Sequence, residues 1–183
     1  MTVWLDVVGI GEEGLRGVGE QGAALINSAD VLVGGERHFQ MIPTNPAQER
    51  LQWPSPFRAL IDELEARRGS KVCVLATGDP MFYGVGTTLA RSFGVSDMAV
   101  HPAPSSINLA CARLGWSVES INVVSVHGRA LSTVVQWLQP GRRLLVISHG
   151  ASTPGDVGAL LQEHGFGASP ITVLEHLGGE RER

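Results

Sequence analysis

One short run of residues limits the fold of this chain more than any other feature. Residues 71–76, Lys-Val-Cys-Val-Leu-Ala, are apolar at every position after the lysine. A strand of this kind has to be covered on both faces, as in a parallel sheet, whereas a half-exposed strand alternates apolar and polar residues. The run therefore predicts an α/β fold whose helices cover a parallel sheet on both sides.

Strands and helices alternate along the first part of the chain. Apolar runs predict further strands, and segments with the length and composition of helices follow them. Strands are predicted at 4–9, 31–33, 51–53 and 98–101, and helices at 15–28, 36–42 and 107–114. This alternation is typical of units in which helices join successive parallel strands.

The strongest helix signal follows the predicted strand at 51–53. Ser55 is expected to be the N-cap, with Pro56 at the first helical position and Gly69 just beyond the end. Helical spacing predicts an apolar face made of Phe57, Leu60, Ile61 and Leu64. This segment therefore predicts a surface helix that packs on the sheet.

A linker at residues 115–120 divides the chain into two predicted α/β domains, 1–114 and 121–183. The second domain repeats the alternation, with strands at 121–126, 142–148 and 171–175 and helices at 131–138 and 154–164. Only three strands follow the linker, and the chain ends in a polar stretch. We therefore expect the C-terminal domain to be truncated.

Charge and composition exclude several classes of function. The formal net charge is −4 and no run of Lys or Arg exceeds two residues, so the sequence predicts no nucleic-acid partner and no membrane surface. The histidines and cysteines show no metal-ligand spacing, and we expect no bound metal. The N-terminus has no basic segment, and its apolar stretch is too short to span a membrane, which favours a cytoplasmic protein.

Glycines follow the first predicted strand. Gly9 and Gly11 let the backbone come close to a ligand, and with Gly14 they match the dinucleotide-binding pattern GxGxxG. That pattern also expects an acidic ribose ligand at the end of the next strand, and no acidic residue is clearly placed there. A tight turn explains the glycines as well as a ligand site does.

Two further loops carry groups that can bind a small ligand. After the strand at 71–76, Gly78 exposes backbone, and Asp79 can either cap the next helix or hold a ligand hydroxyl or amine. Ser105 and Ser106 stand at a predicted helix start, where their hydroxyls can cap that helix or bind a ligand carboxylate or ribose. The residues alone leave both interpretations open.

Basic side chains follow two other strands. Arg37 and His38 come after the second predicted strand, and His127 and Arg129 flank Gly128 after the first strand of the second domain. Guanidinium and imidazole groups form charge-assisted hydrogen bonds to carboxylates. These four side chains are predicted either to recognise carboxylates or to be solvated surface.

Five motifs together resemble those of the tetrapyrrole methylase superfamily. They are Val-Gly-Ile-Gly at 8–11, Val-Gly-Gly-Glu-Arg-His at 33–38, Ala-Thr-Gly-Asp-Pro with Phe-Tyr-Gly at 76–84, Pro-x-x-Ser-Ser at 102–106 and Ser-Val-His-Gly-Arg at 125–129. The second and fifth resemble the branch that holds the C5-methylating part of precorrin-6Y C5,15-methyltransferase (decarboxylating). Two motifs depart from the family's usual pattern, since Ala103 replaces a glycine and Glu12-Glu13 replace Pro-Gly.

The resemblance implies a fold and a reaction. Two α/β domains would bind S-adenosylmethionine in a cleft between them, and its methyl group would pass to C5 of a precorrin in cobalamin biosynthesis. Because the sulfonium methyl group is already activated, the reaction needs mainly alignment and exclusion of water. No catalytic base is predicted, and S-adenosylhomocysteine would be the product.

The resemblance also implies which residues form the site. Cofactor binding would fall to Gly9, Gly11, Gly78, Asp79, Met81, Phe82, Ser105, Ser106, His127 and Gly128. Precorrin acetate or propionate groups are expected to bind Arg37, His38 and Arg129.

Partners and alternatives complete the expectations. A second unit, fused downstream or separate, would methylate C15 and decarboxylate the precorrin, and the protein is expected to be a homodimer. One alternative is a methylase of the same fold with another acceptor, such as an RNA ribose or another precorrin carbon, although the chain has no basic face for RNA. Two others are a non-catalytic domain that binds cofactor or substrate to organise a partner methyltransferase, and a nicotinamide-dependent oxidoreductase.

Overall fold

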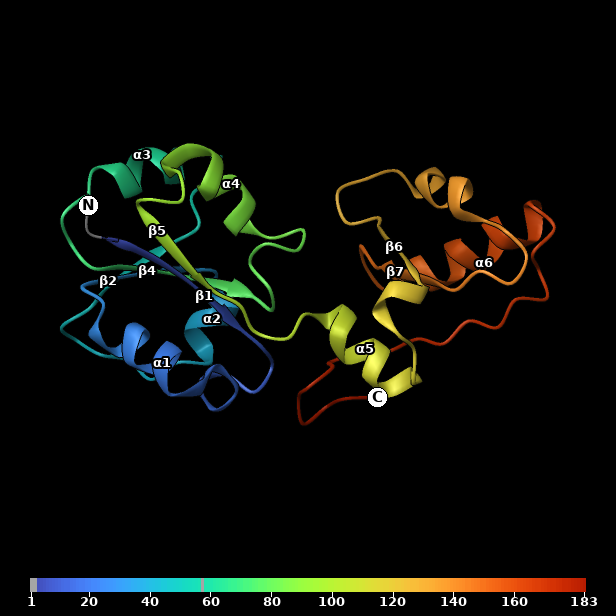
Figure 1. Cartoon of the computed structure of the whole chain (residues 1–183), viewed down its shortest axis with the longest axis horizontal. Helices are drawn as coiled ribbons and strands as arrows, with labels where there is room; N and C mark the ends of the chain where they lie inside the picture. Colours follow the sequence, from blue (N-terminus) through green and yellow to red (C-terminus); the bar gives the residue numbers. More distant parts are fainter. Residues whose placement is uncertain (1–2, 57) are drawn as a thin grey trace. The chain divides into compact units, whose positions relative to one another are not determined.

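The computed structural model describes residues 3–56 and 58–183 and divides into two compact units (Figure 1). The first unit runs to Ser106 and includes Gly178–Glu182, and the second comprises Ile107–Leu177 with Arg183. The helix expected at 107–114 thus groups with the second unit. The functional domain limits and their linker stay a prediction.

The first unit is built on a parallel sheet. Its described strands are β1 (Leu5–Ile10), β2 (Val31–Gly34), β3 (Glu49–Gln52), β4 (Val72–Thr77) and β5 (Met98–His101). They lie in the order β3-β2-β4-β1-β5, and all neighbours are parallel. β4 lies at the centre, with every residue except Thr77 buried. The parallel α/β fold predicted from residues 71–76 is confirmed.

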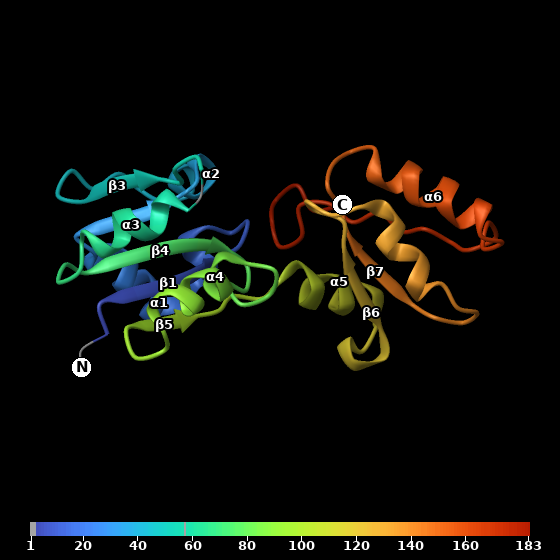
Figure 2. The ribbon, with the colours of Figure 1, turned by 90° about the horizontal axis from the view of Figure 1, so that it is seen from above.

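Helices cover both faces of this sheet (Figures 1 and 2). They are α1 (Leu15–Ser28), α2 (Glu36–Gln40), α3 (Ala59–Glu65) and α4 (Val85–Phe93). On the face that α3 and α4 cover, Leu60 and Leu89 share a buried core with Val7 of β1. On the face of α1 and α2, Ile26 shares a core with Val8. Successive β1 side chains thus enter opposite layers, as the period of a strand requires.

One predicted helix start is wrong. α3 begins at Ala59 rather than directly after Ser55 as N-cap. The Ala59 N–H donates to the Pro56 carbonyl at 3.0 Å, in a turn that precedes the helix. Because Ser55 and Pro56 are exposed, a helical turn there would bury no apolar surface, and burial begins only at Leu60. Phe57, from the predicted apolar face, lies outside the described residues.

The second unit contains a smaller parallel sheet. Its described elements are α5 (Ser106–Leu114), η1 (Val118–Ser120), β6 (Asn122–Ser125), η2 (Leu131–Trp137), β7 (Leu144–Ile147) and α6 (Thr153–Glu163). β6 and β7 pair in parallel, and Val124, Val126 and Val134 form a small buried core. In the described part of the chain, no helix combines the length and apolar character needed to cross a membrane.

The helix expected at 131–138 forms as the 3₁₀ helix η2, whose one buried residue is Val134. Another prediction in the second unit is wrong. The strand expected at 171–175 does not form. Glu175 instead exchanges backbone hydrogen bonds of 2.8 and 3.1 Å with Arg183. An apolar run becomes a strand only where a neighbouring strand pairs with its backbone.

Candidate functional site

Three loops meet at the carboxyl edge of the first sheet, where β1, β4 and β5 end. The Gly78 N–H donates to the Ile10 carbonyl at 3.0 Å, and the Ala103 N–H donates to the Gly78 carbonyl at 3.3 Å. An ideal Cβ atom on Gly9 would lie 2.0 Å from the Gly78 carbonyl oxygen, so a side chain there would force the loops apart. The close approach expected at Gly9 is therefore made to protein backbone.

Space stays open above part of these loops. An ideal Cβ atom on Gly11 would meet no described heavy atom within 4 Å, whereas one on Gly78 would lie 3.3 Å from the Ser105 Cα atom. Gly78 has a φ of +62°, in the left-handed region that favours glycine. We call residues 9–11, 77–79 and 102–105 the glycine cradle. The open space at Gly11 can admit a small ligand.

Apolar side chains flank the cradle after β4. Met81, Phe82 and Tyr83 are 44, 38 and 50% exposed, and the rings of Phe82 and Tyr83 pack edge to face with centroids 4.9 Å apart. The Asp79 carboxylate accepts a hydrogen bond from the Met81 N–H at 2.8 Å, within the loop before α4. It does not cap α4, as one alternative predicted, because that helix begins at Val85 with Gly84 as its N-cap and no side-chain cap. A carboxylate that accepts this bond keeps further lone pairs for a ligand.

The two predicted serines differ in exposure. Ser105 is buried, with 7% of its surface exposed, and its Cα atom lies beside Gly78. Ser106 is exposed and begins α5. Ser105 therefore belongs to the cradle wall, and Ser106 lies at the rim.

His38 is buried beside the cradle and uses both ring nitrogens within the protein. The Gly35 N–H donates to Nδ1 at 3.2 Å, and Nε2 lies 3.0 Å from Oγ1 of Thr77. Burial, together with the positive charge of Arg37, lowers the pKa of His38 below its ordinary value. The imidazole is therefore neutral at pH 7, with its proton on Nε2, because Nδ1 accepts a bond.

Arg37 precedes His38 in α2 and forms an ion pair with Glu12. The Arg37 side chain is 53% exposed and the Glu12 side chain 22% exposed. Glu12 follows β1, which ends at Ile10. The guanidinium expected to hold a substrate carboxylate thus already holds one from the protein.

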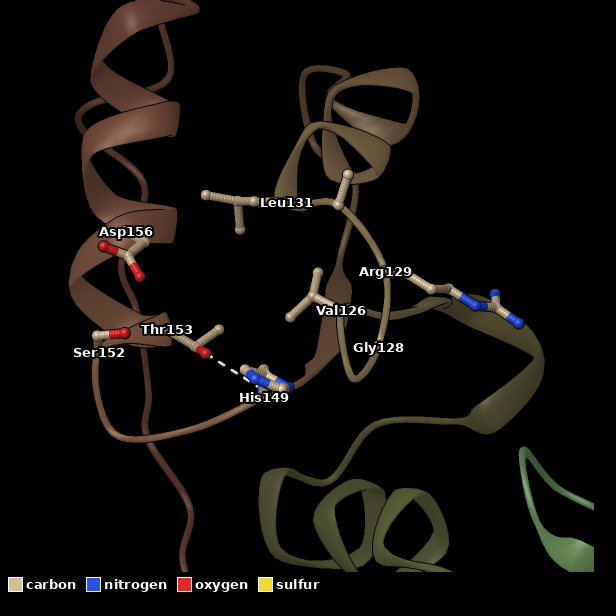
Figure 3. Close-up of a pocket in the computed structure, with 9 residues that line it drawn as sticks. Val126, Gly128, Arg129, Leu131, His149, Ser152, Thr153 and Asp156 are labelled. Carbon is tan, nitrogen blue, oxygen red and sulfur yellow. Dashed lines mark hydrogen bonds between the residues drawn. The ribbon is translucent and has the colours of Figure 1, made fainter. Parts of the chain in front are cut away.

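The second unit has a cavity of about 360 Å³ of its own (Figure 3). Its walls are Val126, Gly128, Arg129, Ala130, Leu131, His149, Ser152, Thr153 and Asp156. His149, Thr153 and Asp156 contribute polar groups, while Val126 and Leu131 are apolar. The Arg129 guanidinium extends away from His149 and Asp156 in Figure 3. The cavity lies where β6 and β7 end, the usual place for ligands in parallel sheets.

Hydrogen bonds at the start of α6 shape this cavity. The Thr153 Oγ1 atom accepts from the N–H groups of both His149 and Gly150, each at 3.2 Å. The ring of His149 lies beside that of His127, with centroids 5.4 Å apart. Thr153 is buried, and its two hydrogen bonds link the loop after β7 to α6.

Neither cysteine lies in these sites. Cys73 and Cys111 are both free and buried. Burial, reinforced by Asp6, raises the pKa of the Cys73 thiol to about 12. Among residues 3–56 and 58–183, no group of three His, Cys, Asp or Glu side chains is arranged to hold a metal ion.

Comparison with known proteins assigns the chain to a family. Residues 5–183 match the family model of the Tetrapyrrole (Corrin/Porphyrin) Methylases. The chain belongs to this family. Its fold is similar to that of uroporphyrin-III C-methyl transferase from Thermus thermophilus complexed with S-adenyl homocysteine, with a TM-score of 0.70. That likeness covers 98% of this methylase and 80% of the other chain at 17% identity, and it confirms the predicted fold.

Curated relatives of this methylase carry more specific names. Precorrin-6Y C(5,15)-methyltransferase (decarboxylating) from Sinorhizobium sp is 47% identical over 183 residues, which are 100% of this chain and 44% of the relative. Cobalt-precorrin-7 C(5)-methyltransferase from Salmonella typhimurium is 32% identical over 179 residues, which are 98% of this chain and 88% of the relative. The methylase chain thus spans less than half of the first relative and most of the second.

The methylase structure separates the predicted site residues into two groups. At the carboxyl edge of the first sheet lie Gly9, Gly11, Arg37, His38, Gly78, Asp79, Met81, Phe82, Ser105 and Ser106, and after β6 of the second unit lie His127, Gly128 and Arg129. Parallel strands end at one edge, which is why loops distant in sequence meet there.

The part of the cavity that follows β7 was not predicted from the sequence. No role was predicted for His149, Ser152, Thr153 or Asp156. A signal was present, because these residues follow the strand predicted at 142–148 and open the helix after it. The carboxyl end of every parallel strand is a candidate position for a ligand contact.

Proposed function

We propose that this methylase transfers the methyl group of S-adenosylmethionine to carbon C5 of a precorrin in cobalamin biosynthesis. The glycine cradle carries the proposal, because three loops converge on the Gly9–Gly78 contact and leave space open at Gly11. The names of both curated relatives include methyl transfer to C5, which supports this carbon as the acceptor.

The cradle fits the cofactor through the open space at Gly11 and the exposed apolar side chains of Met81 and Phe82 beside it. S-adenosylmethionine supplies a methyl group activated by its sulfonium centre. Binding and orientation are assigned to Gly9, Gly11, Gly78, Asp79, Met81, Phe82, Ser105 and Ser106 of the first unit and to His127 and Gly128 of the second. The similar Thermus thermophilus protein is complexed with S-adenyl homocysteine, which supports this class of ligand. Alignment and exclusion of water are the tasks of these residues.

Arg37 and Arg129 are the proposed contacts to the acetate and propionate groups of the precorrin. Arginine forms paired, charge-assisted hydrogen bonds to carboxylates, and the chain is otherwise acidic. Because Arg37 is paired with Glu12, a substrate carboxylate has to replace the Glu12 carboxylate. His38 has both nitrogens engaged within the protein, so its contribution to substrate binding is indirect.

A second unit for C15 methylation and decarboxylation is proposed as the partner, fused or separate. The Sinorhizobium relative carries both activities in its name, and this chain matches 44% of it. The Salmonella relative, named for C5 alone, is matched over 88% of its length, which supports an active C5 unit of about this size. A homodimer is proposed from the family resemblance, and sedimentation equilibrium of the purified chain would test it.

Calorimetric titration of the purified chain with S-adenosylhomocysteine, with NAD as the matched control, tests cofactor binding. Saturable binding of S-adenosylhomocysteine alone supports the cradle as a methylase site. Binding of NAD alone would favour the oxidoreductase alternative and contradict the proposal. Binding of neither ligand would contradict it as well.

Turnover separates an enzyme from a binding domain. The chain is incubated with S-adenosylmethionine and the precorrin, and mass spectrometry reads the gain of one methyl group on the tetrapyrrole. Tight binding of S-adenosylhomocysteine without methyl transfer would identify a non-catalytic domain. Methyl transfer to RNA in a parallel reaction would identify another acceptor.

A further inference from the structure

The two glycines that precede α2 make room for two different rings, those of His38 and Trp53. An ideal Cβ atom on Gly34 would lie 3.3 Å from the Nδ1 atom of His38, and one on Gly35 would lie 3.1 Å from the Trp53 indole. Both distances are tighter than ordinary carbon contacts. The His38 imidazole therefore folds back over Gly34, whose lack of a side chain forms a seat for the ring, and Gly35 makes room for the Trp53 indole.

Two hydrogen bonds hold the ring in this seat and set its tautomer. Nδ1 accepts from the Gly35 N–H at 3.2 Å, so Nε2 carries the proton of the neutral ring. Nε2 then donates to Oγ1 of Thr77 at 3.0 Å, which links α2 to the last residue of β4. His38 is 8% exposed, and a buried imidazole requires both partners.

The hydrogen bond between His38 and Thr77 constrains the cradle, because Thr77 immediately precedes Gly78. The Gly78 N–H and carbonyl hold the loops after β1 and β5, at 3.0 and 3.3 Å. A threonine side chain has few preferred χ1 rotamers, and a hydrogen bond at Oγ1 selects one of them. The series of contacts from His38 through Thr77 thus ends at Gly78, whose backbone N–H and carbonyl bind the other two loops.

We propose that His38 is a positioning residue of the cofactor site, which fixes Thr77 and Gly78 so that the glycine cradle is preformed. The proposal rests on the proposed function, because the cradle's ligand is taken to be S-adenosylmethionine. It assigns His38 a role different from the substrate contact that the family resemblance implies. The role needs the Nε2 donor in particular, and not simply a side chain that fills the seat.

Two pairs of variants isolate that donor. His38→Gln places an amide N–H near the position of Nε2, whereas His38→Asn keeps an acceptor near Nδ1 and cannot reach Thr77. Thr77→Ser keeps the hydroxyl acceptor, whereas Thr77→Val removes it with little change in shape. The full chain is titrated with S-adenosylhomocysteine in a calorimeter, and circular dichroism verifies that each variant is folded.

We expect His38→Asn and Thr77→Val each to raise the Kd for S-adenosylhomocysteine by about three- to tenfold, the value of one hydrogen bond. His38→Gln and Thr77→Ser should stay within about twofold of the wild type. The double variant His38→Asn, Thr77→Val should bind as weakly as either single variant, because one interaction is lost in each case.

The outcomes separate this proposal from the one on which it rests. If the wild type binds S-adenosylhomocysteine and the folded His38→Asn and Thr77→Val chains bind it equally well, the positioning role is wrong. If the conservative and disruptive variants lose affinity alike, the Nε2 donor is not the cause, and the role is again wrong. Absence of binding to the wild type would instead overturn the proposed function.

Discussion

Gly9 and Gly78 are in backbone contact: an ideal Cβ atom on Gly9 would lie 2.0 Å from the Gly78 carbonyl oxygen. The loops after β1 and β4 can meet only because residue 9 has no side chain. Nearby Gly11 is different, since an ideal Cβ atom there would meet nothing within 4 Å. Two glycines in one short motif therefore have separate roles, one in the fold and one beside open space.

Alanine at each glycine should separate these roles. Gly9→Ala should lower the free energy of unfolding by about 1–3 kcal/mol, because overpacking displaces the loop that carries Gly78. Gly11→Ala should leave the unfolding free energy within about 0.5 kcal/mol and weaken S-adenosylhomocysteine binding, because the new methyl group enters the ligand's space. Urea unfolding and calorimetric titration measure both quantities. Equal loss of stability in the two variants would contradict the assignment.

The ion pair between Glu12 and Arg37 should compete with substrate carboxylates. Glu12→Gln should tighten binding of uroporphyrin, a polycarboxylate tetrapyrrole probe, by up to about fivefold, since exposed ion pairs contribute at most about 1 kcal/mol. Arg37→Gln should weaken it by a similar factor. Fluorescence titration at low ionic strength keeps screening small. Weaker binding to Glu12→Gln would show that Glu12 supports Arg37 instead of competing for it.

His38 should make stability depend on pH. Burial and the charge of Arg37 lower its pKa in the folded chain, so the unfolded chain takes up a proton first as the pH falls. The folded state is therefore disfavoured as the pH drops below about 6.5, and no such loss occurs above that value.

The variant His38→Gln removes this titration while it keeps a donor toward Thr77. Between about pH 7.5 and about pH 5, the wild type should lose more unfolding free energy than His38→Gln. Arg37 stays charged throughout, and the bonded groups of Gly35 and Thr77 do not titrate, so the difference reports the imidazole. Equal losses measured by urea unfolding would show that His38 is protonated as readily in the folded chain as in the unfolded chain.

Thr153 should stabilise the loop between β7 and α6 through its hydroxyl. Thr153→Val leaves the N–H groups of His149 and Gly150 without this acceptor, which should cost about 1–3 kcal/mol of unfolding free energy. Thr153→Ser keeps the acceptor and should change stability by less than about 1 kcal/mol. Urea unfolding of both variants provides the comparison. If Thr153→Val were as stable as Thr153→Ser, the Thr153 hydroxyl would not stabilise this loop.

The sequence by itself determined the layered α/β fold and the order of the loops that carry the site. Residues 71–76 become the buried centre of the sheet because an apolar run reports burial on both faces, whatever its neighbours are. The loop motifs at 8–11, 76–84 and 102–106 could be placed at one edge because parallel strands all end there. Both predictions depend on local patterns, which can be recognised in a sequence without knowledge of tertiary contacts.

Only the tertiary structure decided the partners of individual groups. Periodicity predicts that a residue is buried but not what it touches, so the contact of Gly9 with Gly78 and the bond of His38 to Thr77, 39 residues away, were not predictable. The apolar run at 171–175 failed as a strand for the same reason, since strand formation depends on a neighbour whose backbone is free to pair. Pairing over long sequence separations is a property of three-dimensional packing, and no local pattern encodes it.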